Sequence, residues 1–117
     1  MRSTTERIQG ILAVLTNNSL NAHATDISVN VSRYDEKFVV NIKDNGDGMD
    51  DETLERVRKM LNQPHRYELE DYYSGLAGNS MTATGLNIVG MLIDEAEVES
   101  VEGQGTTITV TRYNRPT

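Results

Sequence analysis

The chain has 117 residues, enough for one domain, and 37% of them are hydrophobic, as in an ordinary folded domain. Its formal net charge of −7 disfavours a nucleic-acid partner, because phosphate binders normally present a basic face. The absence of cysteine excludes disulfides and thiolate metal sites, and no apolar run approaches the roughly 20 residues that span a bilayer. No signal-peptide core appears near the first residues, so we expect one cytoplasmic domain over residues 1–117.

The spacing of apolar residues changes within the first third of the chain. Apolar residues recur at three- and four-residue steps over residues 4–24, which predicts a helix with one apolar stripe. From residue 26 the period becomes two. The alternation over 27–32 and again over 38–42 predicts two strands, each with one buried face, joined by a polar turn at 34–37.

The rest of the chain predicts two more helices and a second pair of strands. A short helix is expected over residues 50–61, with acidic residues at the start, where the helix dipole favours them. Residues 62–84 show no period, and so long a loop in so small a domain is functional or disordered. Gly85 opens a third helical pattern, and strands are expected on both sides of a turn at 103–105. This order predicts an α+β fold with a mixed, mostly antiparallel sheet and helices on one face.

The segment DNGDGM, residues 44–49, is the first that could carry chemistry. A carboxylate directly after a strand is held in place and can accept a hydrogen bond from an exocyclic amine, while nearby glycines let a flat ring approach. A strand-ending turn explains the same residues equally well, since Asp, Asn and Gly form turns. A calcium loop is disfavoured because the regular alternation of oxygen ligands is missing.

Three further segments each allow a functional and a plain structural interpretation. Asn18 lies beside the apolar stripe, so its amide oxygen could ligate Mg²⁺, or it could mark a frayed helix end. Backbone N–H groups near Gly85 could hold phosphate oxygens, or Thr84 could simply cap a helix. Thr106 could complete hydrogen bonds around a base that Asp44 binds, or it could only enter a hairpin strand.

The order and spacing of these segments resemble the GHKL family with its Bergerat fold, which includes histidine kinases, anti-sigma-factor serine kinases, gyrase B, HSP90 and MutL. The asparagine helix is similar to the family's N box, and residues 44–49 are similar to its DxGxGM box. Thr84-Gly85-Leu86 resembles the glycine-rich box, and Gly105-Thr106-Thr107 the GTT element. The resemblance covers about Ile8 to Val110, and its second half looks most like histidine kinases and anti-sigma-factor kinases.

The resemblance implies a two-layer α/β sandwich that binds ATP and Mg²⁺. By position, Asn18 would ligate the metal, Asp44 would bind the adenine amino group, and residues 62–84 would form a lid over the nucleotide. The full set of nucleotide-binding residues that it implies is Asn18, Asp44, Gly46, Gly48, Met49, Thr84, Gly85, Leu86 and Thr106.

Three positions depart from the family pattern. Val14 stands four residues before Asn18, where ATPase members carry the Glu that activates water, and a valine can neither accept a proton nor orient water. Ala83 and Asn87 occupy two usual glycine positions. We therefore assign no catalytic residue and expect slow ATP hydrolysis in the absence of a partner.

Two functions remain open at this point. In the first, the domain is a protein kinase catalytic domain in two-component or anti-sigma-factor signalling, and the histidine or serine of a phosphoacceptor protein supplies the nucleophile. In the second, it is a regulatory module in which ATP orders the lid and thereby holds or releases a protein partner. Tyr67, Tyr72 and Tyr73 would suit such a contact, or they could belong to a solvated loop. Self-association into a homodimer is also left open.

Overall fold

The computed structural model of the protein describes residues 3–63 and 82–114. The elements in chain order are α1 (Thr4–Asn21), β1 (Ile27–Arg33), β2 (Lys37–Asp44), α2 (Asp51–Leu61), α4 (Thr82–Leu92), β3 (Glu95–Val101) and β4 (Gly105–Tyr113). Most of the expected lid, including its three tyrosines, lies outside the described residues. None of the described helices is long and apolar enough to cross a membrane.

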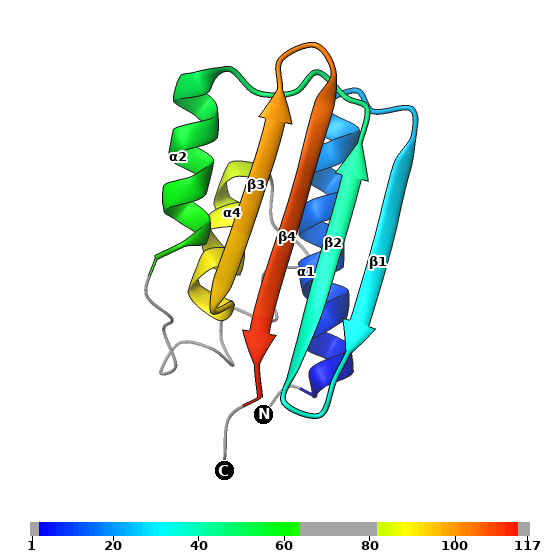
Figure 1. The fold of residues 1–117 in the computed structure, drawn as a ribbon, viewed down its shortest axis with the longest axis vertical. Helices are drawn as coiled ribbons and strands as arrows, with labels where there is room; N and C mark the ends of the chain where they lie inside the picture. The colour runs from blue at the N-terminus through cyan, green and yellow to red at the C-terminus, as the bar shows by residue number, and fades with distance from the viewer. Residues whose placement is uncertain (1–2, 64–81, 115–117) are drawn as a thin grey trace.

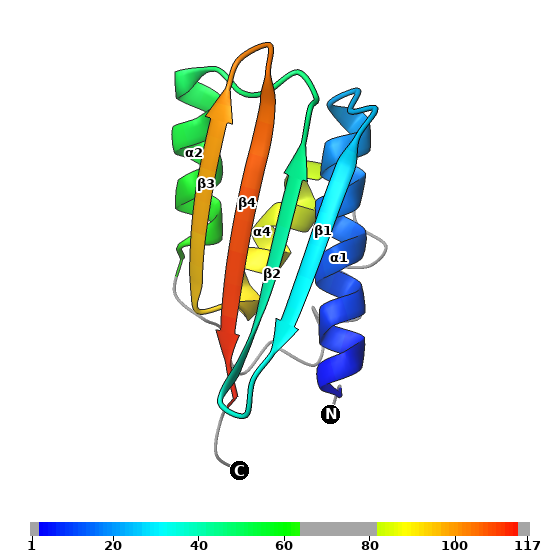
Figure 2. The ribbon, with the colours of Figure 1, turned by 45° about the vertical axis from the view of Figure 1, so that its right-hand side comes forward.

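The described strands form a four-stranded sheet in the order β1-β2-β4-β3. The described helices all cover one face of this sheet, and the opposite face is open (Figures 1 and 2). The predicted α+β, two-layer architecture is therefore confirmed. The sheet was expected to be mixed, but the described strands pair only in antiparallel fashion, because both hairpins and the central β2–β4 pair join oppositely directed strands.

The core lies between the sheet and the helices. Phe38, Val40 and Ile42 of β2 alternate with more exposed neighbours, as expected for a strand with one buried face. β1 departs from that expectation. Val29 and Val31 remain 44% and 38% exposed, although they pair with buried residues of β2. β1 is an edge strand, so fewer neighbours cover it than cover the central strands.

Local hydrogen bonds fix the helix starts. Ser3 and Glu6 form a capping box at the start of α1. Asp50 caps α2 by accepting a 2.8 Å bond from the Thr53 backbone N–H, and hydrogen bonding by the Thr53 side chain and backbone lowers the pKa of the Asp50 carboxyl. The third helix was expected to open at Gly85, but α4 already begins at Thr82, so the Thr84-capped start is wrong.

The central strand pair brings two candidate residues together. β2 ends at Asp44 and β4 begins at Gly105, and the register places Asp44 directly opposite Thr106. These two residues are 62 positions apart in the chain. The antiparallel pairing thus makes one edge of the sheet the meeting point of both segments.

Candidate functional site

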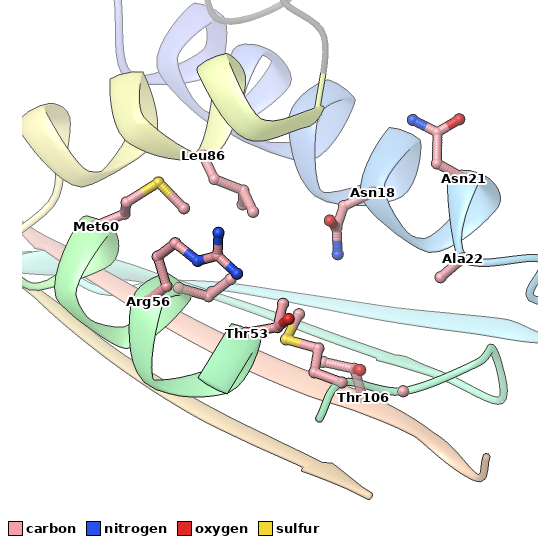
Figure 3. Close-up of a pocket in the computed structure, with 11 residues that line it drawn as sticks. Asn18, Asn21, Ala22, Thr53, Arg56, Met60, Leu86 and Thr106 are labelled. Atoms are coloured by element: carbon pink, nitrogen blue, oxygen red, sulfur yellow. The ribbon is translucent and has the colours of Figure 1, made fainter. Parts of the chain in front are cut away.

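A cavity of about 350 Å³ opens between the helical layer and this end of the sheet. Its described walls include Asn18 of α1, Met49 of the loop after β2, Thr53 and Arg56 of α2, Leu86 of α4 and Thr106 of β4. Figure 3 shows Asn18 and Arg56 extending into the space between α1 and α2. Three helices, one strand and one loop therefore contribute to this single cavity. Its size suits a small-molecule ligand.

The Asp44 carboxylate lies just behind the cavity wall formed by Thr106. Its Oδ1 accepts bonds from the backbone N–H groups of Gly46 at 2.8 Å and Thr106 at 3.3 Å. Its Oδ2 accepts a 2.6 Å bond from the Ser19 hydroxyl. Asp44 is only 8% exposed, and these three donors offset the cost of burying its charge. A carboxylate has about four acceptor positions, so one remains for a ligand donor.

The Ser100 hydroxyl organises the neighbouring wall. It accepts a 2.8 Å bond from the Met49 backbone N–H and donates to the Gly105 carbonyl at 3.1 Å. The 2.8 Å contact between the Ser100 and Thr106 hydroxyls can run in either direction; with the single Ser100 hydrogen on the Gly105 carbonyl, Thr106 is the donor. The lone pairs of Thr106 are then free to accept. Asp44 and Thr106 together make this end of the site an acceptor region, which suits an exocyclic amine.

The family model for histidine kinase-, DNA gyrase B- and HSP90-like ATPases matches residues 3–115. The chain belongs to this family. No match was found among curated proteins. The chain is thus an ATP-binding GHKL module, in agreement with the family inferred from its motifs.

Asn18 provides a test of whether this GHKL site fits a nucleotide with its metal. Its side chain lines the cavity and is 9% exposed, yet it makes no hydrogen bond to any residue within 3–63 or 82–114. The Asn18 amide thus faces the open cavity, and its oxygen is available to a bound ligand. An amide oxygen is a hard donor suitable for Mg²⁺. The described residues hold no cluster of three or more His, Asp or Glu side chains placed to bind a metal, so Asn18 would share the metal mainly with phosphate and water oxygens.

The glycines of the DNGDGM segment serve close packing of the chain. A Cβ on Gly46 would lie 2.7 Å from the Ala22 carbonyl oxygen, at the end of α1. Gly48 has a φ of +71°, and a Cβ there would overlap the Val101 carbonyl. Both glycines therefore let the loop pack between α1 and the β3–β4 turn, and Gly48 also borders the cavity.

The structure brings most of the predicted nucleotide-binding residues to one place. Those that line the cavity are Asn18, Gly48, Met49, Leu86 and Thr106. Asp44 and Gly46 stand behind this wall, joined to it by hydrogen bonds. Gly85 is buried in α4 without lining the cavity, and the Thr84 side chain lies outside the described residues. The roles of all nine toward ATP stay predictions.

Sequence reasoning missed two serines, Ser19 and Ser100, as members of the site. Each had a detectable signal. Ser19 is a polar residue on the apolar stripe of α1, and it is 1% exposed. Ser100 continues the inward-facing alternation of Ala96 and Val98 in β3, where a polar side chain needs a partner.

Proposed function

We propose that this GHKL domain binds ATP with Mg²⁺ in the cytoplasm and acts as the catalytic domain of a protein kinase in signalling. The acceptor would be a histidine or serine of a phosphoacceptor protein. The main support for this proposal is that the described cavity walls include no carboxylate and no histidine. Such a site holds and orients a nucleotide without a base to activate water, so the nucleophile comes from a partner.

The position of Val14 supports this view. Val14 is 1% exposed, packs in the apolar core and is not among the described residues that line the cavity. The position that resembles the water-activating Glu of ATPase members therefore contributes packing alone. Slow hydrolysis is the expected consequence, while transfer to a protein acceptor remains open to the domain.

Different residues would bind the base, the phosphates and the metal of the nucleotide. Asp44 and Thr106 would accept from the adenine amino group, and Met49 and Leu86 would cover the apolar base. Asn18, on α1, would face the phosphates and the metal. Bound ATP with Mg²⁺ supplies the transferable phosphoryl group and a cation that offsets its charge. Transfer would form a bond between the acceptor atom and the γ-phosphorus as the bond to the ADP oxygen breaks, and the proton of the acceptor would leave to a base of the partner or to water.

A regulatory module without turnover is the second candidate. Asn87, at a usual glycine position of the family, accepts bonds from the Gln63 side chain at 2.8 and 3.1 Å. Gln63 also donates to the Met60 carbonyl at 2.7 Å, so the two Asn87 oxygens share the second hydrogen of its amide group. These bonds tie α4 to the end of α2, where a glycine would leave the backbone freer. A fixed α4 suits a domain that presents a stable surface when ATP binds.

Calorimetric titration with ATP and Mg²⁺ tests the binding site directly. Asp44→Asn replaces an acceptor oxygen by a donor amide, and we expect about 10- to 100-fold weaker binding, because hydrogen bonds to charged groups contribute about 1.5–3 kcal/mol. Asp47→Asn is the matched control, since Asp47 lies in the same loop but is 64% exposed and faces His23. Equal affinities of wild type and Asp44→Asn would remove Asp44 from the site.

Labelled γ-phosphate separates the two candidates. Transfer of the label to a polypeptide, faster than its release as inorganic phosphate, supports the kinase. Tight ATP binding with neither transfer nor release supports the regulatory module.

A further inference from the structure

Arg56 extends into the nucleotide cavity from α2. It is the only charged side chain among the described residues that line this cavity; the other walls are aliphatic, thioether, hydroxyl, amide or backbone. Figure 3 shows the Arg56 side chain entering the cavity from α2 and the Asn18 side chain entering it from α1. A cation therefore stands opposite the amide for which the structure offers no described partner.

The other basic residues of α2 are engaged elsewhere. Arg58 donates to the Val98 carbonyl at 2.8 and 3.1 Å, which ties α2 to β3. Lys59 faces Glu55 at 3.8 Å, and both side chains are largely exposed. Arg56, in contrast, makes no hydrogen bond or close ion pair within the described ranges, although its charge attracts the Asp50 carboxylate at the start of α2. Its five N–H donors are available to a ligand in the cavity.

The charge of Arg56 is opposite in sign to the net charge of the chain. The chain carries a net charge of −7, so its overall field disfavours a polyanionic ligand. A cation inside the cavity reverses the sign locally, and a planar guanidinium matches phosphate oxygens with two parallel hydrogen bonds. The acceptor region of Asp44 and Thr106 would repel a phosphate, so the phosphates belong at the side where Arg56 and Asn18 face each other.

We propose that Arg56 binds a phosphate group of the nucleotide and gives the site its preference for phosphorylated over uncharged adenine ligands. This inference rests on the proposed ATP binding but is not implied by it. The resemblance to the family places phosphate contacts at residues 84–86 and assigns none to α2. Arg56 would thus act as a specificity-determining residue on the wall opposite the N-box helix.

Titration of three ligands with increasing phosphate number tests the assignment. Wild type, Arg56→Gln, Arg56→Lys and Lys59→Gln are each titrated with adenosine, ADP and ATP. We expect Arg56→Gln to weaken ATP at least 10-fold, ADP less, and adenosine not at all, because only the charged ligands lose a contact. Arg56→Lys keeps the charge and should recover part of the ATP affinity. Lys59→Gln removes the same charge from the outer side of α2 and should leave all three affinities unchanged.

The outcomes separate this inference from the proposed function. Equal weakening of all three ligands by Arg56→Gln would place Arg56 against the base or sugar and overturn the phosphate assignment. Unchanged ATP affinity would overturn it as well. A wild-type domain that binds none of the three ligands would instead overturn the proposed function, and the Arg56 inference with it. Matching thermal unfolding midpoints of Arg56→Gln and Lys59→Gln would show that folding does not explain the difference.

Discussion

The Ser19 hydroxyl donates a 2.6 Å hydrogen bond to Oδ2 of Asp44, so the last turn of α1 holds the carboxylate at the end of β2. Both residues are buried. The N-box helix therefore carries Asn18 and also orients the Asp44 carboxylate through the next residue, Ser19. The Ser19–Asp44 bond therefore links the asparagine helix directly to the DNGDGM segment.

Ser19→Ala should lower both stability and ATP affinity. Loss of a buried hydrogen bond to a charged group costs about 1.5–3 kcal/mol, and a carboxylate with one donor fewer is less well oriented. We expect a lower thermal unfolding midpoint and several-fold weaker ATP binding by calorimetry. Thr16→Ala is the control on the same helix, because the Thr16 hydroxyl bonds only to the helix carbonyls of Leu12 and Ala13. Similar losses in both variants would contradict a special role of the Ser19–Asp44 bond.

Ser100→Ala should change which purines the site accepts. With its own hydrogen on the Gly105 carbonyl, Ser100 accepts the hydrogen of the Thr106 hydroxyl and leaves the lone pairs of Thr106 available to an amine. Without Ser100, the Thr106 hydroxyl can turn and donate, which suits the carbonyl of hypoxanthine. We therefore expect the ratio of ATP to inosine triphosphate affinity to fall about 10-fold, the size of one hydrogen bond of about 1 kcal/mol or slightly more.

The control for this change is Ser32→Ala, since Ser32 bonds only to the Asn30 side chain in the exposed part of β1. An unchanged ATP-to-inosine ratio in Ser100→Ala, together with a lower stability, would reduce Ser100 to a structural residue.

Sequence patterning predicted the fold well wherever burial is one-sided. The alternation in β2 and the stripe of α1 follow directly from a face that meets the core. The exposure of Val29 was not predictable in the same way, because an alternating pattern does not reveal that its strand lies at the sheet edge. Strand order is a long-range property, and the pattern of a single segment carries little information about it.

The candidate site was predictable as a set of segments, but not as a set of contacts. Asn18, Asp44 and Thr106 could be chosen because their segments match family motifs, and the strand register then brings the last two opposite each other. Ser100 and Arg56 belong to no such motif. Their positions near the cavity depend on how β3 and α2 pack, which the local sequence does not encode.

Gly48→Ala should destabilise the domain more than Gly103→Ala. Both glycines have positive φ, +71° and +81°, so an alanine at either position pays about 1–2 kcal/mol of backbone strain. A Cβ at Gly48 would also overlap the Val101 carbonyl, whereas a Cβ at Gly103 meets nothing within 4 Å. We expect a total cost of about 2–4 kcal/mol for Gly48→Ala in urea unfolding. Equal costs for the two variants would show that the loop and the β3–β4 turn are not tightly packed.

Val14→Glu should fail to create an ATPase. Residue 14 resembles the position of a catalytic Glu, but the Val14 side chain is 1% exposed and packs in the apolar core. An unpaired carboxylate there would cost several kcal/mol, so the chain would lose stability before it gained a base. We expect a much lower unfolding midpoint and no faster release of inorganic phosphate from ATP.

Val14→Ala separates the effect of the charge from the effect of lost packing. Removing two methyl groups from the core should cost about 1–3 kcal/mol, by comparison with other large-to-small core substitutions. Val14→Glu should cost clearly more than this and leave ATP turnover as slow as in wild type. A folded Val14→Glu domain with faster hydrolysis would mean that residue 14 reaches the nucleotide, and that the missing acid alone keeps this domain from hydrolysing ATP.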